Sequence, residues 1–588
     1  MIPLLDTARR HPDGAALMYG ATDARVSHAT GTARGHAKTN NQDAGGSPNV
    51  SGGAQTLSWR ELADAARRMA GALRLSGVRP GDVVATQFGA TREHVVLLHA
   101  IWLCGAACAP LNLRLTPAER DAQITHLQPV AVVSDEADTG GDTSATTDLS
   151  AAGTASRAGT ASAAGAFRHL SPRALQERAR NMDPTATELR APGDDDICSI
   201  LFTSGTAGSP KAVPHTWSNH RASAAASAAN LGGAPADVWQ CVIPLYHIGG
   251  LAILLRSLFS GMAVRLHARF DAGEMLDAIR CDGVTITSLV PTMLHRLMEH
   301  DAEFRASAVP SLRAILLGGS AAHRGLWDEA LRRGLPMLGT YGLTESCSQV
   351  ATGSPDAVAD DAYTAGRPLE GVEIEIRDAR DRPLPAGEEG EILLRGPMLA
   401  RGYLQANRKM TREDAREHTV ELEKKSATEP DIPAEPTESG AAVDTMHPVF
   451  EDGWFRTGDI GRFDARGCLV VAGRREDLII SGGENIAPQE IEDVLLRHDA
   501  VEEAAVVGLP DNEWGERVAA ALVLRRPAQI DAIAAACREA LAGYKLPRSW
   551  HVVESLPRTA SGKLRREELR RLLIEQEEKG QEGSGSET

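Results

Sequence analysis

The sequence predicts an α/β protein with a large N-terminal domain of layered, mostly parallel sheets and helices, a small β-barrel-like part, and a small α+β C-terminal domain. Its 588 residues are too many for one hydrophobic core, so at least two domains are expected. Strand and helix patterns alternate through most of the chain, which is typical of parallel sheets covered by helices. Short strands follow Gly387, and a second mixed pattern begins near residue 474. We therefore expect domains at 1–473 and 474–588.

The composition of the chain argues against several classes of binding partner. The formal net charge of −17 argues against nucleic acid or an anionic membrane as the main partner. No apolar run reaches membrane-spanning length, and the N-terminus lacks the basic and apolar regions of a signal peptide, which predicts a cytoplasmic protein without stable membrane insertion. The eight cysteines show neither a C-x-x-C pair nor zinc-ligand spacing and are interpreted as core residues. The oligomeric state stays open, a homo-oligomer included.

Three stretches depart from the alternating pattern, at 21–55, 139–165 and 412–447. The first two are rich in Gly, Ala, Ser and Thr, and the third is charged and contains proline. Such compositions bury too little apolar surface to offset the entropy of ordering, so we expect flexible insertions.

The first regular elements show the strand–helix alternation. Between Glu61 and Leu75 the apolar positions fall on one helical face. A short buried strand is expected over 82–88, and an apolar helix over 94–103. This order predicts the start of a parallel sheet.

A loop of Thr, Ser and Gly closed by Pro-Lys follows the strand that ends near Phe202. Glycines permit a tight turn whose successive N–H groups bind anions, while hydroxyls and a lysine add donors and charge. The pattern is not the Walker motif, and an ordinary polar surface loop is the alternative. The candidate phosphate-binding residues are Thr203, Ser204, Gly205, Thr206, Gly208 and Lys211.

A turn carrying Tyr246 and His247 precedes an apolar helix over 251–259 that contains Arg256. A buried guanidinium needs a partner, because an isolated buried charge is costly. That partner is either an internal acid or an anionic group of a substrate held by two hydrogen bonds.

Two later strands end in groups suited to ligand binding. One ends in Gly318-Gly319-Ser320, where a flat ligand can approach the backbone, and the next leads to Thr344 and Glu345. Open α/β sheets bind ligands at the carboxyl ends of their strands. Glu345 suits Mg²⁺, although a helix-capping acid is an equally good interpretation from its position alone.

The rest of the chain adds an acid and a lysine. Asp459 is expected in a glycine-containing turn, as a ligand of a ribose diol or as an ordinary Asx turn. The small domain is expected to contain helices at 490–497 and 530–541 with strands between and after them. Lys563 lies in a Ser-Gly turn before a charged helix, where it either reaches into a cleft or is solvated.

Together these segments resemble the adenylate-forming superfamily of acyl-CoA synthetases, adenylation domains and luciferases. The motifs are TSGTAGSPK, YGLTES, RTGD, GRRED, SGGENIAPQEIE and PRTASGKLRR, in family order from about Leu57 to the end. Within the superfamily the segments PLYHIGGLAILLRS, YGLTESCSQVAT and LIISGGENIAPQEIE are most similar to the o-succinylbenzoate–CoA ligases of menaquinone biosynthesis.

The resemblance implies ATP, Mg²⁺ and coenzyme A, and a two-step reaction through an acyl-adenylate. It implies that Lys563, Glu345, Thr344 and Lys211 are catalytic, with Glu345 as the metal ligand. It places the adenine at Gly318, Gly319 and Tyr341, the ribose at Asp459 with Arg474 beside it, and the pantetheine tunnel at Gly482 and Gly483. A swivel of the small domain is implied at Glu476, where the family usually has Asp or Lys. That departure weakens the hinge assignment.

For the acid, the resemblance favours 2-succinylbenzoate, whose second carboxylate needs an anchor. The expected substrate-binding residues are His247, Arg256, Ser320, Ser348 and Gln349. One alternative is a CoA ligase for another aryl, fatty or short-chain acid. A second is an amino-acid adenylation enzyme, although 244–250 lacks the acid that holds the substrate amine in that group. A non-catalytic nucleotide binder is the third, and it would have no need of Lys563.

Overall fold

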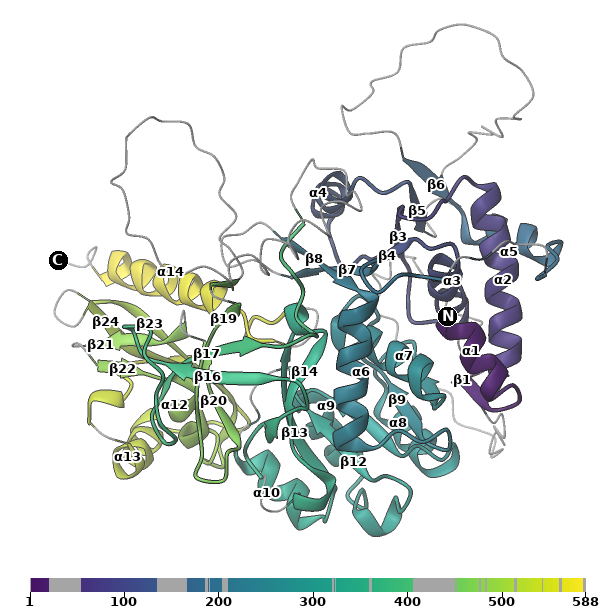
Figure 1. Ribbon diagram of the computed structural model, residues 1–588. Helices are drawn as coiled ribbons and strands as arrows, with labels where there is room; N and C mark the ends of the chain where they lie inside the picture. Colours follow the sequence, from purple (N-terminus) through teal and green to yellow (C-terminus); the bar gives the residue numbers. More distant parts are fainter. Residues whose placement is uncertain are drawn as a thin grey trace, which may run out of the picture. The chain divides into compact units, whose positions relative to one another are not determined.

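The structure is a computed structural model (Figure 1). It describes residues 2–20, 54–134, 167–185, 189, 191–203, 210–319, 322, 324–358, 362–404, 450–451, 453–474, 477–481, 484–511, 515–541, 543–559 and 563–584. All of 139–165 and 412–447, and nearly all of 21–55, therefore lie outside the described residues. By its internal contacts the chain divides into two units. The first unit comprises Met1–Phe202, Gly233–Thr285 and Gln405–Arg412; the second comprises Thr203–Gly232, Ile286–Leu404 and Glu413–Thr588.

The first unit contains a parallel sheet ordered β6-β5-β3-β4-β7. Its strands are β3 (Val83–Gln87), β4 (Ala107–Pro110), β5 (Ala131–Ser134), β6 (Arg168–Leu170) and β7 (Ile197–Thr203). Val84 pairs with Cys108 on one side and Ala131 on the other, so β3 is central and buried on both faces. The apolar strands β3, β4 and β5 thus follow the pattern expected for buried parallel strands.

A second group of strands in this unit is ordered β9-β10-β1-β2, parallel except for β2. Its strands are β1 (Ala15–Tyr19), β2 (Gln55–Ser58), β9 (Val238–Cys241) and β10 (Ala263–Leu266). The helices of the first unit are α1 (Pro3–Arg10), α2 (Trp59–Leu75), α3 (Arg92–Leu103), α4 (Pro117–Leu127), α5 (Pro172–Arg180), α7 (Ile248–Ser260) and α8 (Ala272–Cys281).

Helix α2 illustrates why these segments are helical. Ser58 and Glu61 form a capping box, in which each side chain accepts the backbone N–H of the other residue. The predicted apolar face is buried, and α2 packs beside α3 and α5 (Figure 1). The strand and the helix expected after α2 are confirmed as β3 and α3.

The second unit begins with β8 (Lys211–Thr216) and α6 (Trp217–Leu231) and then contains the parallel strands β11-β12-β13. Antiparallel strands β14 and β15 continue this sheet from β13. The bounds are β11 (Ile286–Leu289), β12 (Ala314–Leu317), β13 (Met337–Leu343), β14 (Ser348–Thr352) and β15 (Arg367–Pro368), with helices α9 (Pro291–His300) and α10 (Arg324–Arg332).

The predicted β-rich part is an antiparallel sheet ordered β16-β17-β19-β18, with β20 paired to β19. Its strands are β16 (Glu373–Arg377), β17 (Gly390–Arg395), β18 (Phe450–Glu451), β19 (Trp454–Phe463) and β20 (Leu469–Arg474). Among the residues that the structure describes, no strand pairing closes this sheet into a barrel. In place of the expected barrel-like part, the structure therefore has an open sheet that packs around an apolar cluster including Ile392 and Leu469.

The C-terminal part is α+β, as predicted. Its sheet is ordered β22-β21-β24-β23, and β25 runs parallel to β24. The strands are β21 (Ile479–Ser481), β22 (Glu484–Ile486), β23 (Val501–Asp511), β24 (Gly515–Leu524) and β25 (Ser549–Val552); the helices are α12 (Pro488–Leu495), α13 (Ile530–Ala540) and α14 (Arg566–Ser584). Apolar clusters lie on both faces of this sheet, with α12 and α13 on one and α14 on the other. The predicted boundary at residue 473 stays a prediction, because the second unit continues across it.

None of the helices in the described part of the chain is both long and apolar enough to cross a membrane.

Candidate active site

The catalytic candidates Lys211 and Glu345 meet at one tyrosine in the second unit. The Tyr403 hydroxyl donates to Glu345 Oε1 at 2.9 Å. The Lys211 ammonium lies over the Tyr403 ring, 4.8 Å from its centroid, in a cation–π contact. A cation that can bind phosphate and a carboxylate that can bind Mg²⁺ are thus held by one side chain.

Backbone hydrogen bonds fix this arrangement. Glu345 lies in a 3₁₀ turn, Thr344–Ser346, directly after β13. The carbonyl of Glu345 accepts the N–H of Ala400 at 2.7 Å, and the carbonyl of Ala212 in β8 accepts the N–H of Leu404 at 2.8 Å. The segment 400–404 therefore ties the start of β8 to the turn that carries Thr344 and Glu345.

The predicted phosphate loop is only partly described. Thr203 ends β7, and Lys211 is exposed at the start of β8. Ser204, Gly205, Thr206 and Gly208 lie outside the described residues, and so does Ser320. Their roles stay predictions.

The ribose candidate Asp459 lies inside strand β19, which corrects the expected turn. Gly458, with φ of +72°, gave the turn signal, but its positive φ occurs within the strand. Asp459 is 5% exposed, and its Oδ2 accepts the Tyr341 hydroxyl at 2.6 Å. Opposite Asp459 in β20 is Arg474, which the structure describes only through its backbone. The structure thus brings together three of the residues expected around the nucleoside.

The glycines after β12 are required by close packing. A Cβ on Gly318 would lie 2.7 Å from Thr340 Cγ2 and 2.8 Å from the Thr340 carbonyl oxygen. Gly319 has φ of +81°, a conformation that side-chain-bearing residues rarely adopt. Packing against Thr340 and the positive φ therefore account for these glycines, and their role at the adenine stays a prediction.

The substrate candidates His247 and Arg256 belong to the first unit. His247 precedes α7 and contacts Tyr246, with ring centroids 4.7 Å apart. Arg256 is 4% exposed, and its guanidinium lies over the Trp239 ring, 5.5 Å from the centroid. The aromatic face stabilises the buried charge of Arg256, both if its anionic partner is an internal acid and if it is a substrate.

A glycine fixes how α7 begins. A Cβ on Gly250 would lie 2.3 Å from the carbonyl oxygen of Ile243 and 2.5 Å from that of Pro244. Only glycine permits this approach of α7 to the turn that carries His247.

Ser348 and Gln349 open β14. Ser348 has a positive φ of 93°, and Gln349 is 4% exposed. The amide oxygen of Gln349 accepts the Ser227 hydroxyl of α6 at 2.9 Å. This contact gives Gln349 a role in packing, and substrate binding by either residue stays a prediction.

In the C-terminal part, Lys563 is exposed. Its N–H donates to Thr559 Oγ1 at 3.0 Å, and its carbonyl accepts the Thr559 N–H at 2.7 Å. These two bonds join Lys563 to Thr559 just before α14. Glu476, Gly482 and Gly483 lie outside the described residues.

Sequence reasoning missed Tyr403. It stands in the short segment RGYL between a β-rich region and a charged stretch, where a single aromatic residue has no periodic pattern. Its contacts form because the segment after β17 packs against β8, and a local sequence pattern cannot indicate such a contact between distant segments.

Comparisons with known proteins agree with this geometry. The model of the AMP-binding enzyme family matches residues 37–404, and that of the AMP-binding enzyme C-terminal domain matches residues 490–563. The 2-succinylbenzoate–CoA ligase of Bacillus licheniformis is 38% identical over 522 residues, which cover 88% of this chain and 95% of the relative.

Solved structures of the o-succinylbenzoate CoA synthetase of Bacillus subtilis are also similar. The complex with its acyl-adenylate intermediate has a TM-score of 0.74 at 32% identity and covers 97% of each chain. The complex with ATP and a magnesium ion has the same TM-score and identity and covers 97% of this chain and 99% of that one. With these matches and the site above, the chain belongs to the AMP-binding enzyme family of adenylate-forming enzymes.

Proposed function

We propose that this protein is an ATP-dependent acid–CoA ligase whose acid is 2-succinylbenzoate, a step of menaquinone biosynthesis. The observation that carries the proposal is the placement of Lys211 and Glu345 against Tyr403. The curated relatives named 2-succinylbenzoate–CoA ligase, at 34–38% identity, supply the acid.

The first half-reaction forms one bond and breaks one. A carboxylate oxygen of the succinyl group attacks the α-phosphorus of ATP, and the bond between the α-phosphorus and the bridging oxygen breaks to release pyrophosphate. Negative charge accumulates on the phosphate oxygens, so preorganised cations stabilise the transition state. Lys211 and Lys563 supply two such cations, and Asp459 with Tyr341 holds the ribose.

The carboxylate of Glu345 fits a magnesium ion, because Mg²⁺ binds few protein carboxylates and leaves places for phosphate oxygens. When bound there, Mg²⁺ neutralises part of the phosphate charge. The hydrogen bond from Tyr403 orients that carboxylate.

The second half-reaction transfers the acyl group to coenzyme A. The thiolate sulfur attacks the activated carbonyl carbon, and the bond to the phosphate oxygen breaks to release AMP. We propose that the C-terminal part moves between the two steps, with Gly482 and Gly483 lining the path of the thiol.

Arg256 is the proposed anchor for the second carboxylate of the acid. It is buried, always charged, and presents a fork of donors that matches a carboxylate. His247, which directly precedes α7, is proposed to line the same pocket.

The test is AMP release with ATP, Mg²⁺ and CoA, offering 2-succinylbenzoate beside benzoate, octanoate and malonate. We expect a strong preference for 2-succinylbenzoate that falls at least tenfold in Arg256→Met, with KM for ATP unchanged. Methionine keeps the long apolar stem against Trp239. Arg280→Met, an exposed position on α8, is the matched control.

Turnover of a monocarboxylate that is indifferent to Arg256 would retain the adenylate-forming mechanism and remove the 2-succinylbenzoate assignment. Pyrophosphate exchange driven by an amino acid would replace the acid–CoA ligase with an amino-acid adenylation enzyme.

A further inference from the structure

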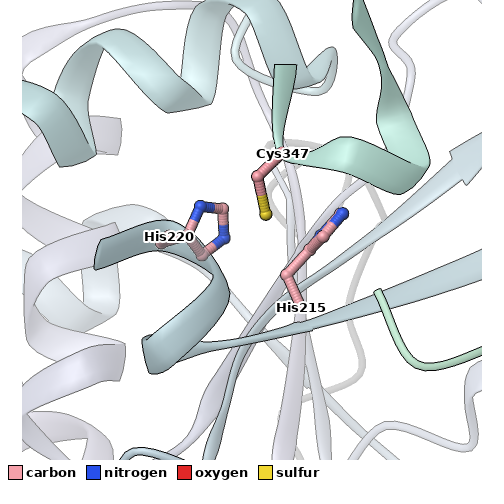
Figure 2. A group of neighbouring side chains, drawn as sticks. All are labelled: His215, His220 and Cys347. Atoms are coloured by element: carbon pink, nitrogen blue, oxygen red, sulfur yellow. The ribbon is translucent and has the colours of Figure 1, made fainter. Parts of the chain in front are cut away.

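Two histidines and a cysteine meet inside the second unit, next to the turn that carries Thr344 and Glu345. His215 lies near the end of β8, His220 lies in the first turn of α6, and Cys347 directly follows the Thr344–Ser346 turn. Their ligand atoms lie within 4.8 Å of one another. Figure 2 shows the Cys347 sulfur directed toward the two imidazole rings. The three residues are at most 2% exposed.

Rigid local structure holds these side chains in place. Thr216 and Asn219 form a capping box at the β8–α6 corner, which fixes His215 and His220 relative to each other. The Ser223 hydroxyl of α6 donates to the carbonyl of Cys347 at 2.8 Å. The three side chains therefore come from preorganised elements, which favours a binding site over a chance contact.

The donor set selects a class of ion. Imidazole nitrogens and a thiolate are the ligands that Zn²⁺ and softer ions prefer, whereas Mg²⁺ prefers oxygen. His215 Nε2 donates to the Thr344 carbonyl at 2.6 Å, the kind of outer contact that metal-binding histidines make. In that tautomer Nδ1 carries the lone pair that a metal needs.

We propose that His215, His220 and Cys347 form an inhibitory binding site for a thiophilic divalent ion, with Zn²⁺ as the fitting ion. Binding replaces the thiol proton: the sulfur–hydrogen bond breaks, a zinc–sulfur bond forms, and one proton is released. Bonds of 2.0–2.3 Å place tetrahedral ligand atoms roughly 3.5 Å apart. The present separations lie within 4.8 Å, so binding is expected to draw the three ligand atoms, Cys347 among them, closer together.

That movement reaches the catalytic turn directly. Cys347 is two residues after Glu345, and His215 holds the carbonyl of Thr344. A displacement of about 1 Å at a reacting group costs up to 10²-fold in rate. Zinc at this site is therefore expected to lower adenylation by roughly tenfold to a hundredfold, a consequence that rests on the proposed function.

The binding test needs no substrate. Metal-free full-length protein is titrated with Co²⁺, a spectroscopic substitute for Zn²⁺, and the near-ultraviolet band of a cobalt–thiolate bond is recorded. We expect one equivalent of Co²⁺ to produce the band and Zn²⁺ to abolish it. Cys347→Ser should lose the band and bind Zn²⁺ at least about tenfold more weakly. The matched control is Cys281→Ser, which removes the exposed cysteine on α8 and should keep both properties.

A second variant guards against misfolding of the first. His215→Gln retains an N–H donor for the Thr344 carbonyl and removes an imidazole, so it should fold while binding Zn²⁺ at least tenfold more weakly. No thiolate band in the wild type, or a band that Cys281→Ser removes, would overturn the site.

The inhibitory role has its own readout. AMP formation at fixed Mg²⁺ should fall with Zn²⁺ in the wild type and stay constant over the same range in His215→Gln. A thiolate band without inhibition would support the metal site and overturn its proposed effect on the catalytic turn. A protein that shows the band but activates no acid would refute the proposed function and retain the site.

Discussion

At the scale of single residues, Tyr403 has two separable roles. Its hydroxyl binds the Glu345 carboxylate, and its ring lies under the Lys211 ammonium. The first contact orients a carboxylate expected to bind metal, and the second places a cation expected to bind phosphate. Because one atom makes the first contact and the ring makes the second, substitutions can remove them one at a time.

We therefore predict that Tyr403→Phe raises the Mg²⁺ concentration needed for half-maximal adenylation by roughly tenfold, since a hydrogen bond to a charged group contributes about 1.5 kcal/mol or more. KM for ATP should change little, because the ring under Lys211 remains. Tyr403→Leu removes the ring as well and should raise both values. Steady-state kinetics over a Mg²⁺ series measures both. Identical profiles for the two variants would show that the roles are not separable.

Two residues show what local patterns miss. The Gly458-Asp459 pair indicates a turn, yet the positive φ of Gly458 is absorbed within strand β19, where pairing with β17 and β20 outweighs the local signal. Tyr403 gives no signal, because its partners lie 58 and 192 positions earlier in the chain. Residue types at loops were predictable; the contacts between loops were not.

At the scale of elements, a largely buried ion pair anchors the start of α14. Arg566 Nη2 donates to Glu492 Oε2 of α12 at 3.0 Å, and Arg566 Nη1 donates to the Val506 carbonyl of β23 at 2.9 Å. The other oxygen of Glu492 accepts the Val506 N–H at 2.7 Å. Arg566 thus joins α12, β23 and α14, three residues after Lys563.

Breaking this pair should be costly. We predict that Arg566→Met destabilises the C-terminal part by about 3–5 kcal/mol, because Glu492, only 7% exposed, is left as an unpaired buried charge. Adenylation should fall too, since Lys563, three residues before Arg566, loses a nearby anchor. Calorimetric unfolding measures the first effect, and AMP release in limiting ATP measures the second.

The double variant Glu492→Gln with Arg566→Met should recover part of the lost stability, as expected for coupled residues. Arg395→Met is the matched control, because its ion pair with Glu373 is exposed, and its unfolding midpoint should stay near that of the wild type. Equal losses in the two methionine variants would contradict a special role for the buried pair.

At the scale of the whole molecule, buried histidines determine how the stability of the folded state depends on pH. Burial lowers the pKa of His94 and His215 to about 4, and of His99 and His267 to about 3. The unfolded chain binds a proton at each near pH 6.5, whereas the folded chain does not. Their contribution to stability is therefore complete above pH 6.5 and is lost as the pH falls toward 4.

We predict that the free energy of unfolding, and with it the unfolding midpoint, falls as the pH is lowered from 7 to 5. The free energy changes by up to about 1.4 kcal/mol per pH unit for each histidine. Asp493 opposes the trend, because burial raises its pKa to about 6 and its neutral form favours the folded state as the pH falls. His94→Gln should flatten the slope. Thermal unfolding at pH 7, 6 and 5 measures it, and a flat profile would refute the assignment.

The fold was predictable to a greater extent than the sites. Apolar periodicity marked α2, β3 and α3, because each buries one face or both faces locally. The open form of the β-rich sheet, in place of the expected barrel-like part, was not predictable, since closure depends on pairing between strands far apart in sequence. The same limit hid His215, His220 and Cys347, whose linear spacing matches no zinc motif although the fold brings them together.

The eight cysteines have a practical consequence. Seven are buried, and Cys281 at the end of α8 is exposed. Burial raises the pKa of Cys104 to about 11 and of Cys108 and Cys241 to about 12, so at neutral pH these thiols are almost never thiolates, the form that alkylating reagents attack. A maleimide fluorophore should therefore label the native sequence at one position, giving a singly tagged protein without the removal of any other cysteine.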